Sequence, residues 1–250
     1  MARYGMVIDL DQCTGCRGCM EACKVENNTP QATFWMYLFR FEDGEYPDTR
    51  ISFLPRPCMH CDNAPCVKVC PTGARYKRDD GLVATNTDAC NGCRYCDAAC
   101  PYGVNYFNEK DPKANQYLNW TAPEVVKALG EVTNGAVPPY KNPDLELFYG
   151  KEKRKIAGGG HRKGVIEKCT FCVQRVEKGL KPACVNICPA FALEFGDLDD
   201  PNSAVSKRLN AKRSFRLREE FGTEPKVHYV GKARPGTGAR EIEQTGGKSA

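Results

Sequence analysis

The sequence lacks any hydrophobic run long enough to cross a membrane. Its longest run is Phe34–Phe39, whereas a spanning helix needs roughly 18–20 apolar residues. The first ten residues hold one arginine and pass straight into an apolar, strand-like stretch with no Ala-x-Ala cleavage site. We therefore expect no direct membrane span and no export signal of the chain's own, although a signal-bearing partner could carry it across a membrane.

Sequence motifs of catalysis are also scarce. The chain has only three histidines, and it has no Ser/His/Asp grouping, no phosphate-binding loop and no G-x-G-x-x-G motif. Its 250 residues suit one compact unit or two small domains. A content of 41% hydrophobic and 27% charged residues is ordinary for a globular protein. The sequence therefore predicts no catalytic site.

Cysteine is the residue present in excess. The sixteen cysteines fall into four groups of four, with none left over. The groups are Cys13-x2-Cys16-x2-Cys19-x3-Cys23, Cys58-x2-Cys61-x4-Cys66-x3-Cys70, Cys90-x2-Cys93-x2-Cys96-x3-Cys100 and Cys169-x2-Cys172-x11-Cys184-x3-Cys188. Prolines 71, 101 and 189 follow the last three groups directly, whereas the first group ends in Cys23-Lys24.

Three kinds of chemistry use clustered cysteines. Disulfide bridges are disfavoured, because neighbours two residues apart are placed to share a ligand rather than to bridge. Structural zinc takes two cysteine pairs separated by a longer loop, which suits only the fourth group. The C-x2-C-x2-C-x3-C-P run is that of bacterial ferredoxins, in which the fourth cysteine binds the neighbouring cluster. Four such runs predict four [4Fe–4S] clusters and one-electron transfer.

The spacing also predicts how the groups pair. Between the second and third groups there is room for one hairpin, with strands at Ala74–Lys77 and Leu82–Thr85 around a turn at Asp79–Gly81. By elimination, the first and fourth groups pair, flanked by strand-like Met6–Leu10 and Ala192–Phe195. We expect an α+β fold of two bacterial-ferredoxin-like 2[4Fe-4S] lobes, one inserted within the other; this pairing is a hypothesis.

The exchange of fourth cysteines gives four ligand sets. Cluster 1 would be held by Cys13, Cys16, Cys19 and Cys188; cluster 2 by Cys169, Cys172, Cys184 and Cys23; cluster 3 by Cys58, Cys61, Cys66 and Cys100; and cluster 4 by Cys90, Cys93, Cys96 and Cys70. Iron is thus expected on the same sixteen cysteines.

The expected domain boundaries follow from the motifs. The outer lobe takes residues 1–50 and 165–200, the inner lobe 51–107, an insertion 108–164, and a C-terminal extension or tail 201–250. The insertion contains a helical-looking Pro123–Leu129 and ends in the basic run Lys151–Lys163. That run fits a solvated loop or a partner contact better than a nucleic-acid contact.

Residues beside the cysteines have mainly structural interpretations. His60 is expected to form hydrogen bonds rather than to bind iron, since each group already has four cysteines. Tyr95, Tyr102 and Phe171 are expected to exclude water by packing. Basic residues near a cluster raise its reduction potential by stabilising the added electron. Those within or next to the motifs are Arg17, Lys24, Lys68, Arg94 and Lys168.

These motifs resemble those of the four-cluster iron–sulfur subunits of dimethyl sulfoxide reductase family molybdoenzymes. The matching segments are Met6–Asp9, Cys58–Cys66, Cys70–Ala74, Cys100–Val104, Lys168–Cys172 and Gly196–Pro201, and their order is specific. Glu26–Thr29 and the long insertion look most like the respiratory arsenate reductase small subunit. Polysulfide, thiosulfate and tetrathionate reductase subunits are close relatives.

The resemblance implies a non-catalytic electron-transfer subunit. Its partners would be a molybdopterin-containing catalytic subunit and a membrane anchor or another quinone-linked donor. Cluster 1 would face the catalytic subunit and cluster 4 would lie at the far end. The resemblance also implies export to the periplasm with a signal-bearing partner, with the cytoplasm as the alternative.

Two other functions remain as alternatives. A free-standing soluble polyferredoxin would carry the same clusters, although a mobile carrier has no need of the insertion and tail as docking surfaces. A zinc structural module would be colourless. The formal charge of +5 counts each cysteine as a neutral thiol, but four clusters bring the oxidised chain to about −3. The basic surplus therefore predicts no nucleic-acid partner.

Overall fold

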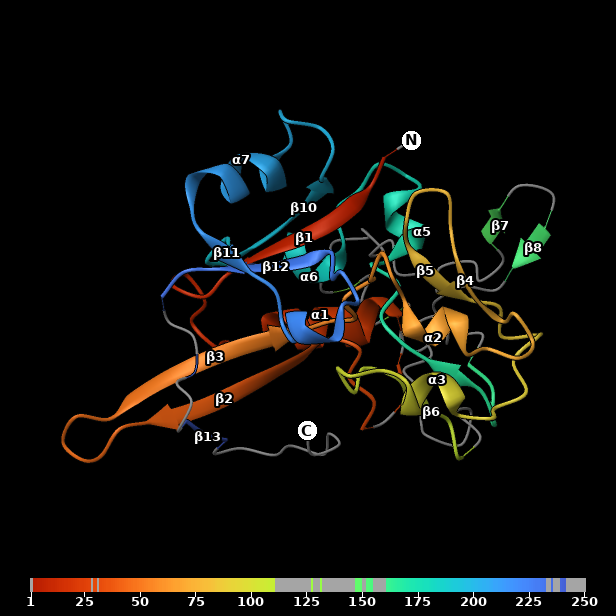
Figure 1. Ribbon diagram of the computed structural model, residues 1–250, viewed down its shortest axis with the longest axis horizontal. Coiled ribbons are helices and arrows are strands. Elements are labelled where there is room, and N and C mark those ends of the chain that lie inside the picture. The colour runs from red at the N-terminus through yellow and green to blue at the C-terminus, as the bar shows by residue number, and fades with distance from the viewer. Residues whose placement is uncertain are drawn as a thin grey trace.

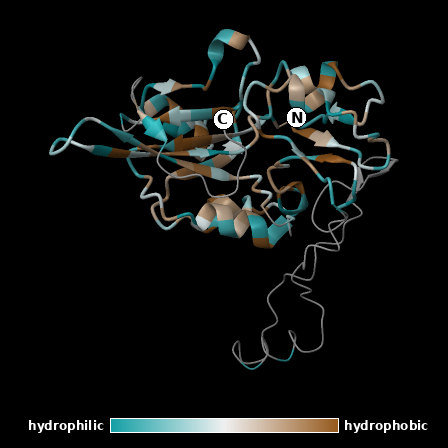
Figure 2. Cartoon of the chain, turned by 90° about the horizontal axis from the view of Figure 1, so that it is seen from below, coloured by the Kyte–Doolittle hydropathy of each residue, from teal (hydrophilic) through white to brown (hydrophobic). Residues whose placement is uncertain are grey.

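The computed structural model describes residues 2–27, 29–30, 32–110, 127, 131, 147–149, 152–154, 161–232, 235 and 239–241. In Figure 1 a four-stranded sheet lies above a layer of short helices, and a long hairpin projects to one side. Figure 2 shows hydrophobic residues along the strands and helices of this body. No helix in these described parts combines the length and apolarity that crossing a membrane requires.

The four-stranded sheet has the order β10-β1-β12-β11. β1 (Tyr4–Asp9) lies antiparallel to β10 (Leu193–Asp197) and parallel to β12 (Val227–Val230), and β11 (Ser214–Phe215) completes the edge. Both faces of β1 are covered, which explains its unbroken apolar run. Strands expected from the sequence before the first motif and after the fourth are confirmed, with ends shifted by one or two residues.

The residues after the fourth motif differ from expectation. The sequence predicted an extension over 201–250, yet α7 (Ala204–Ala211) packs on β1 and β10, and β12 lies inside the sheet. Val205 and Val230 enclose Val7 in a small apolar cluster. Parallel strands are joined by long crossover connections rather than by tight turns. The sequence therefore contained no local turn from which the pairing of β12 with β1 could be predicted. Residues 204–230 therefore belong to the fold's core.

His228 on β12 predicts an acid-sensitive fold. Burial, followed by nearby Arg216 and Arg3, lowers the pKa of His228 to about 4 from 6.5. Between these values the unfolded chain binds the proton and the folded chain does not, so stability falls as pH drops through this window. We expect a loss of about 1–2 kcal/mol after allowance for solvent screening. As the pH falls from about 7.5 to about 5, the melting temperature of His228→Gln should fall less than that of wild type. Melting temperatures that fall in parallel for the two proteins would contradict this.

The inner part of the chain contains the expected hairpin. β4 (Arg75–Lys77) and β5 (Val83–Thr85) pair antiparallel, and Gly81 turns with φ of 77°. The cysteine-bearing helices α2 (Pro65–Lys68) and α3 (Tyr95–Ala98) contact each other. This confirms the hairpin between the second and third motifs.

Other elements connect the motifs. α1 (Gly18–Asn27) packs on α6 (Ala183–Asn186), with α5 (Val173–Val176) between the cysteines of the fourth motif. The remaining strands are β2 (Tyr37–Asp43), β3 (Arg50–Arg56) and β13 (Arg240–Glu241) in one sheet, β6 (Tyr106–Phe107) with β9 (Ile166–Glu167), and β7 (Leu147–Tyr149) with β8 (Glu152–Arg154); a 3-10 turn η2 covers Glu219–Phe221. The expected helix Pro123–Leu129, apart from 127, and most of the basic run lie outside the described residues.

Candidate metal centres

All four cysteine motifs share one backbone turn. The residue before the second cysteine has a left-handed conformation in each: Gly15 (φ 69°), His60 (44°), Gly92 (71°) and Phe171 (55°). The turn aims backbone N–H groups at sulfur, since His60 N lies 3.5 Å from Cys58 Sγ and Phe171 N lies 3.4 Å from Cys169 Sγ. A non-glycine residue in this region costs about 1–2 kcal/mol. The second and fourth motifs bear this conformational cost at His60 and Phe171, whose backbone N–H groups donate to cysteine sulfur.

A short helix then carries the third cysteine of each motif. Cys19, Cys66, Cys96 and Cys184 are each the second residue of a helix. The closing cysteine follows four residues later. Cys23 lies within α1, whereas Cys70, Cys100 and Cys188 lie two residues beyond the ends of their helices. Each closing cysteine is thus about one helical turn away from the third cysteine of its motif.

The first and fourth motifs bring their thiols together. Around Cys19, burial raises the thiol pKa to about 12, and Cys13, Cys16 and Cys188 add to it. Burial likewise raises the pKa of Cys184 well above its ordinary value, with contributions from Cys172, Cys23 and Cys169. Each neighbourhood contains one closing cysteine from the other motif.

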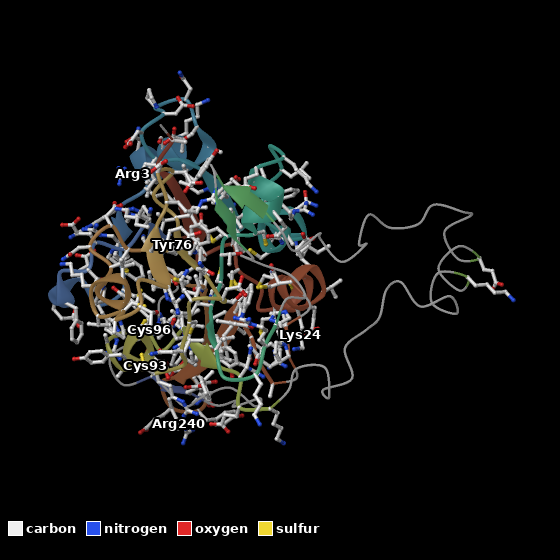
Figure 3. All side chains as sticks on the ribbon, turned by 90° about the vertical axis from the view of Figure 1, so that its right-hand side faces the viewer. Arg3, Lys24, Tyr76, Cys93, Cys96 and Arg240 are labelled. Carbon is white, nitrogen blue, oxygen red and sulfur yellow. The ribbon has the colours of Figure 1, made fainter. Side chains whose placement is uncertain are left out.

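The second and third motifs are arranged alike. Burial raises the pKa of Cys61 to about 12, with contributions from Cys58, Cys66 and Cys100. One cavity is lined by these same four cysteines and by Lys168. Figure 3 labels Cys93 and Cys96 in the lower part of the molecule in that view, above Arg240.

The thiol neighbourhoods form a row. Cys19 contributes to the electrostatics of Cys184, which links the neighbourhood of Cys13 to that of Cys169. Cys58 likewise contributes to the electrostatics of Cys169, which links the second motif to the fourth. The charges of Cys66 and Cys96 both act on Arg75, which links the second motif to the third. The interior neighbourhoods are largely buried, whereas Cys16 and Cys93, at the two ends of the row, are exposed. The two ends of the row are therefore its most accessible points.

The donor set fits iron–sulfur clusters. All sixteen cysteines lie within the described residues, and none forms a disulfide. Ionising a buried thiol is costly without a compensating charge, and a cationic cluster core supplies that charge to its thiolate ligands. Within the described residues, no three His, Cys, Asp or Glu side chains form a site for a single metal ion.

His60 joins the second motif to the fourth. Its Nδ1 accepts from Val83 N–H at 3.0 Å, so its Nε2–H donates to the Cys169 carbonyl at 3.0 Å. Its ring packs on Phe171, with 3.9 Å between ring centroids. Burial, then Lys168 and Lys226, lower the pKa of His60 well below its ordinary value. The expected hydrogen-bonding role is confirmed, since both ring nitrogens are occupied in a neutral ring.

The other neighbours of the cysteines give a mixed outcome. Tyr102 and Phe171 are 5% and 1% exposed and pack as expected, but Tyr95 is 59% exposed, so its predicted packing role is wrong. Among the basic residues expected near clusters, Lys168 is buried and bonds the carbonyls of Val83 and Cys169. Arg75, which the sequence analysis missed, is also buried beside cysteine sulfur. Arg75 lies after the second motif rather than within it, so the cysteine spacing did not predict that it contacts sulfur.

Sixteen thiols in ferredoxin-type turns define an iron–sulfur protein of the multi-cluster ferredoxin class. Models of a 4Fe-4S dicluster domain match residues 49–117 with 155–198, and residues 12–74. The arsenate respiratory reductase iron-sulfur subunit of Shewanella sp. ANA-3 is 43% identical over 236 residues, covering 91% of this chain and 96% of the relative. The chain belongs to the family of iron–sulfur electron-transfer subunits of dimethyl sulfoxide reductase-type molybdoenzymes.

Two further relatives show the breadth of the family. A selenate reductase subunit from Mesobacillus selenatarsenatis is 40% identical over 229 residues, covering 90% of this chain and 70% of the relative. A polysulfide reductase subunit from Wolinella succinogenes is 34% identical over 237 residues, covering 94% and 97%. The chain carries four [4Fe–4S] clusters and is a non-catalytic, electron-transferring subunit.

Proposed function

We propose that this chain conducts electrons along four cluster sites between a molybdopterin catalytic subunit and a quinone-linked or other redox partner. The observation that carries the proposal is the row of thiol neighbourhoods with exposed cysteines only at its ends, Cys16 and Cys93. A [4Fe–4S] cluster bound at each site supplies one-electron redox chemistry. The protein's part is to bury the interior sites, exclude water and fix the order of the sites.

The ligand sets in this proposal are those expected from the motif exchange. The mutual influence of the Cys13, Cys16, Cys19 and Cys188 thiols supports the first set, and that of Cys23, Cys169, Cys172 and Cys184 the second. The cavity between Cys58, Cys61, Cys66 and Cys100 supports the third. For the fourth set, Arg75 contacts both Cys70 and Cys96, which supports their sharing a site with Cys90 and Cys93.

The same proposal nests one lobe inside the other. Pairing of β1 with β10 and packing of α1 on α6 support an outer lobe of residues 1–50 and 165–200. The β4–β5 hairpin and the contact of α2 with α3 support an inner lobe of 51–107. We add 201–230 to the outer lobe because β12 pairs with β1, and we keep 108–164 as a partner contact.

The identity of the catalytic partner follows from the relatives. Arsenate, selenate and polysulfide reductase subunits align with nearly the whole chain, so a reductase of an oxyanion or of polysulfide is the proposed partner. The name of the first relative includes respiration, which supports a periplasmic complex exported by a signal on the catalytic subunit. Cell fractionation with and without that signal tests the compartment.

Copurification tests the subunit assignment. A tagged chain expressed with its neighbouring genes should retain a molybdenum-containing large subunit through anaerobic affinity and size-exclusion steps. Isolation of the chain alone, fully loaded with clusters and stable, would favour the free-standing polyferredoxin instead. Molybdenum and iron measured on the same fractions distinguish these results.

Replacing Cys16 tests which end serves the catalytic subunit. Cys16→Ser removes a ligand from the exposed end assigned to that subunit, so we expect near-complete loss of turnover driven through the chain. Reduction of the other three clusters by the far-end donor should persist, because their ligands are untouched. Turnover equal to wild type would contradict the proposed cluster order.

A further inference from the structure

Arg75 is a fully buried cation between two cysteine neighbourhoods. The side chain is 2% exposed at the start of β4. Its Nη2 donates to Cys96 Sγ at 3.5 Å, and its backbone N–H donates to Cys70 Sγ at 3.4 Å. One residue therefore contacts a sulfur from the second motif and a sulfur from the third.

The guanidinium is held by neutral acceptors. Nη1 donates to Thr85 Oγ1 at 2.6 Å, and Nη2 donates to Asn105 Oδ1 at 2.9 Å. No carboxylate among the described residues forms an ion pair with it, whereas buried Arg78 close by has both Asp80 and Glu177. Buried charges are normally paired. We therefore expect the positive charge of Arg75 to be balanced by an anion that is not a carboxylate side chain.

Two observations identify the sulfur sites as that partner. The Nη2–H of Arg75 already donates to the sulfur of Cys96, which is a proposed cluster ligand. The Arg75 Nε–H is also buried and has no acceptor in the described structure. A bound cluster with four thiolates carries about two negative charges, which balances this cation and offers sulfur as an acceptor.

We propose that Arg75 is a positioning residue that raises the reduction potential of the cluster held by Cys70, Cys90, Cys93 and Cys96. The inference rests on the ligand sets proposed above. Reduction adds one electron and no bond changes, so a fixed cation at a sulfur ligand favours the reduced state through charge alone. Its effect is large because the Arg75 side chain is buried, so solvent and counterions screen its charge little.

Arg94 provides a matched control at the same site. It follows Cys93 directly, but its side chain is 50% exposed and is neutralised by Glu109 at 3.3 Å. Its guanidinium also stacks on Phe107, with 3.7 Å to the ring centroid. Charge removed here should be replaced by solvent and counterions. The two arginines thus separate the effect of a buried cation from that of an exposed one.

The test is reductive titration followed by EPR on the intact, cluster-loaded protein. We expect Arg75→Met to lower the reduction constant of one cluster by about tenfold or more, which is about 59 mV for one electron. Arg75→Lys should recover most of the shift, and Arg94→Met should change the constant by less than about threefold. The shifted signal should be the one that disappears in Cys93→Ser.

Contrary results are equally defined. Unmoved midpoints in Arg75→Met with all iron retained would overturn the inference, as would equal shifts in Arg75→Met and Arg75→Lys. If Arg75→Met loads iron incompletely, Thr85→Asp is the variant to test in its place. A carboxylate at position 85 would pair with Nη1 of Arg75 and should lower the midpoint potential of the same cluster. An unchanged midpoint potential in Thr85→Asp overturns the inference. Failure of the proposed ligand sets differs from all of these, because Cys70→Ser and Cys93→Ser would then lack different EPR signals.

Discussion

Replacing Cys23 by serine is expected to remove the cluster of the fourth motif and leave that of the first motif intact. Cys23 closes the first motif in sequence, but its thiol lies with Cys169 and Cys172, whose charges add to the effect of burial on its pKa. Asn27 Nδ2 lies near both Cys23 Sγ, at 3.5 Å, and Cys172 Sγ, at 3.7 Å. Iron should fall from about 16 to about 12 atoms per chain.

Matched variants identify the missing cluster. EPR spectra of reduced Cys23→Ser and Cys184→Ser should lack the same signal, because both residues belong to one proposed set. Cys188 closes the fourth motif in sequence, but Cys188→Ser should lack a different signal, shared with Cys16→Ser. If Cys23→Ser instead resembled Cys16→Ser, each motif would hold its own cluster and the exchange of fourth cysteines would be wrong.

Tyr229→Ala is expected to destabilise the whole fold by about 3–5 kcal/mol, the usual cost of removing a buried aromatic ring. Tyr229 is 0% exposed on β12, its ring stacks on Phe215 at 5.6 Å, and its hydroxyl donates to Pro55 O at 2.8 Å. The residue therefore joins the last part of the chain to β3. Loss of visible cluster absorbance in increasing guanidinium measures the change.

Tyr229→Phe is the control for the ring itself. It keeps the packing but leaves the Pro55 carbonyl without its donor, so about 1–2 kcal/mol is expected. An alanine variant as stable as wild type would show that residues 201–230 do not belong to the core. A phenylalanine variant as unstable as the alanine variant would place the energy in the hydrogen bond instead.

Local features were predictable from the sequence. The cysteine spacing sets the turn and helix of the first three motifs, because four ligands within 11 to 13 residues leave few conformations. The Asp-Gly turn predicted the β4–β5 hairpin, since glycine accepts the positive φ seen at Gly81. His60 was interpreted correctly because four cysteines per group left it no metal to bind.

Long-range features were not predictable. β12 is four residues long and pairs in parallel with β1 from the other end of the chain, and nothing in Val227–Val230 specifies that partner. The burial of Arg75 and the exposure of Tyr95 depend on how the two motif pairs pack, which spacing within one motif does not encode. Tyr95 lies two residues after Cys93, which is itself exposed.

Counting clusters in the full chain shows directly whether it holds four [4Fe–4S] clusters. Mössbauer spectra of the anaerobically purified, ⁵⁷Fe-labelled protein, combined with iron and sulfide analysis, measure cluster type and number together. We predict about sixteen iron and about sixteen sulfide per chain, all in [4Fe–4S] form. About eight iron, or zinc in place of iron, would contradict the account of a four-cluster electron-transfer subunit.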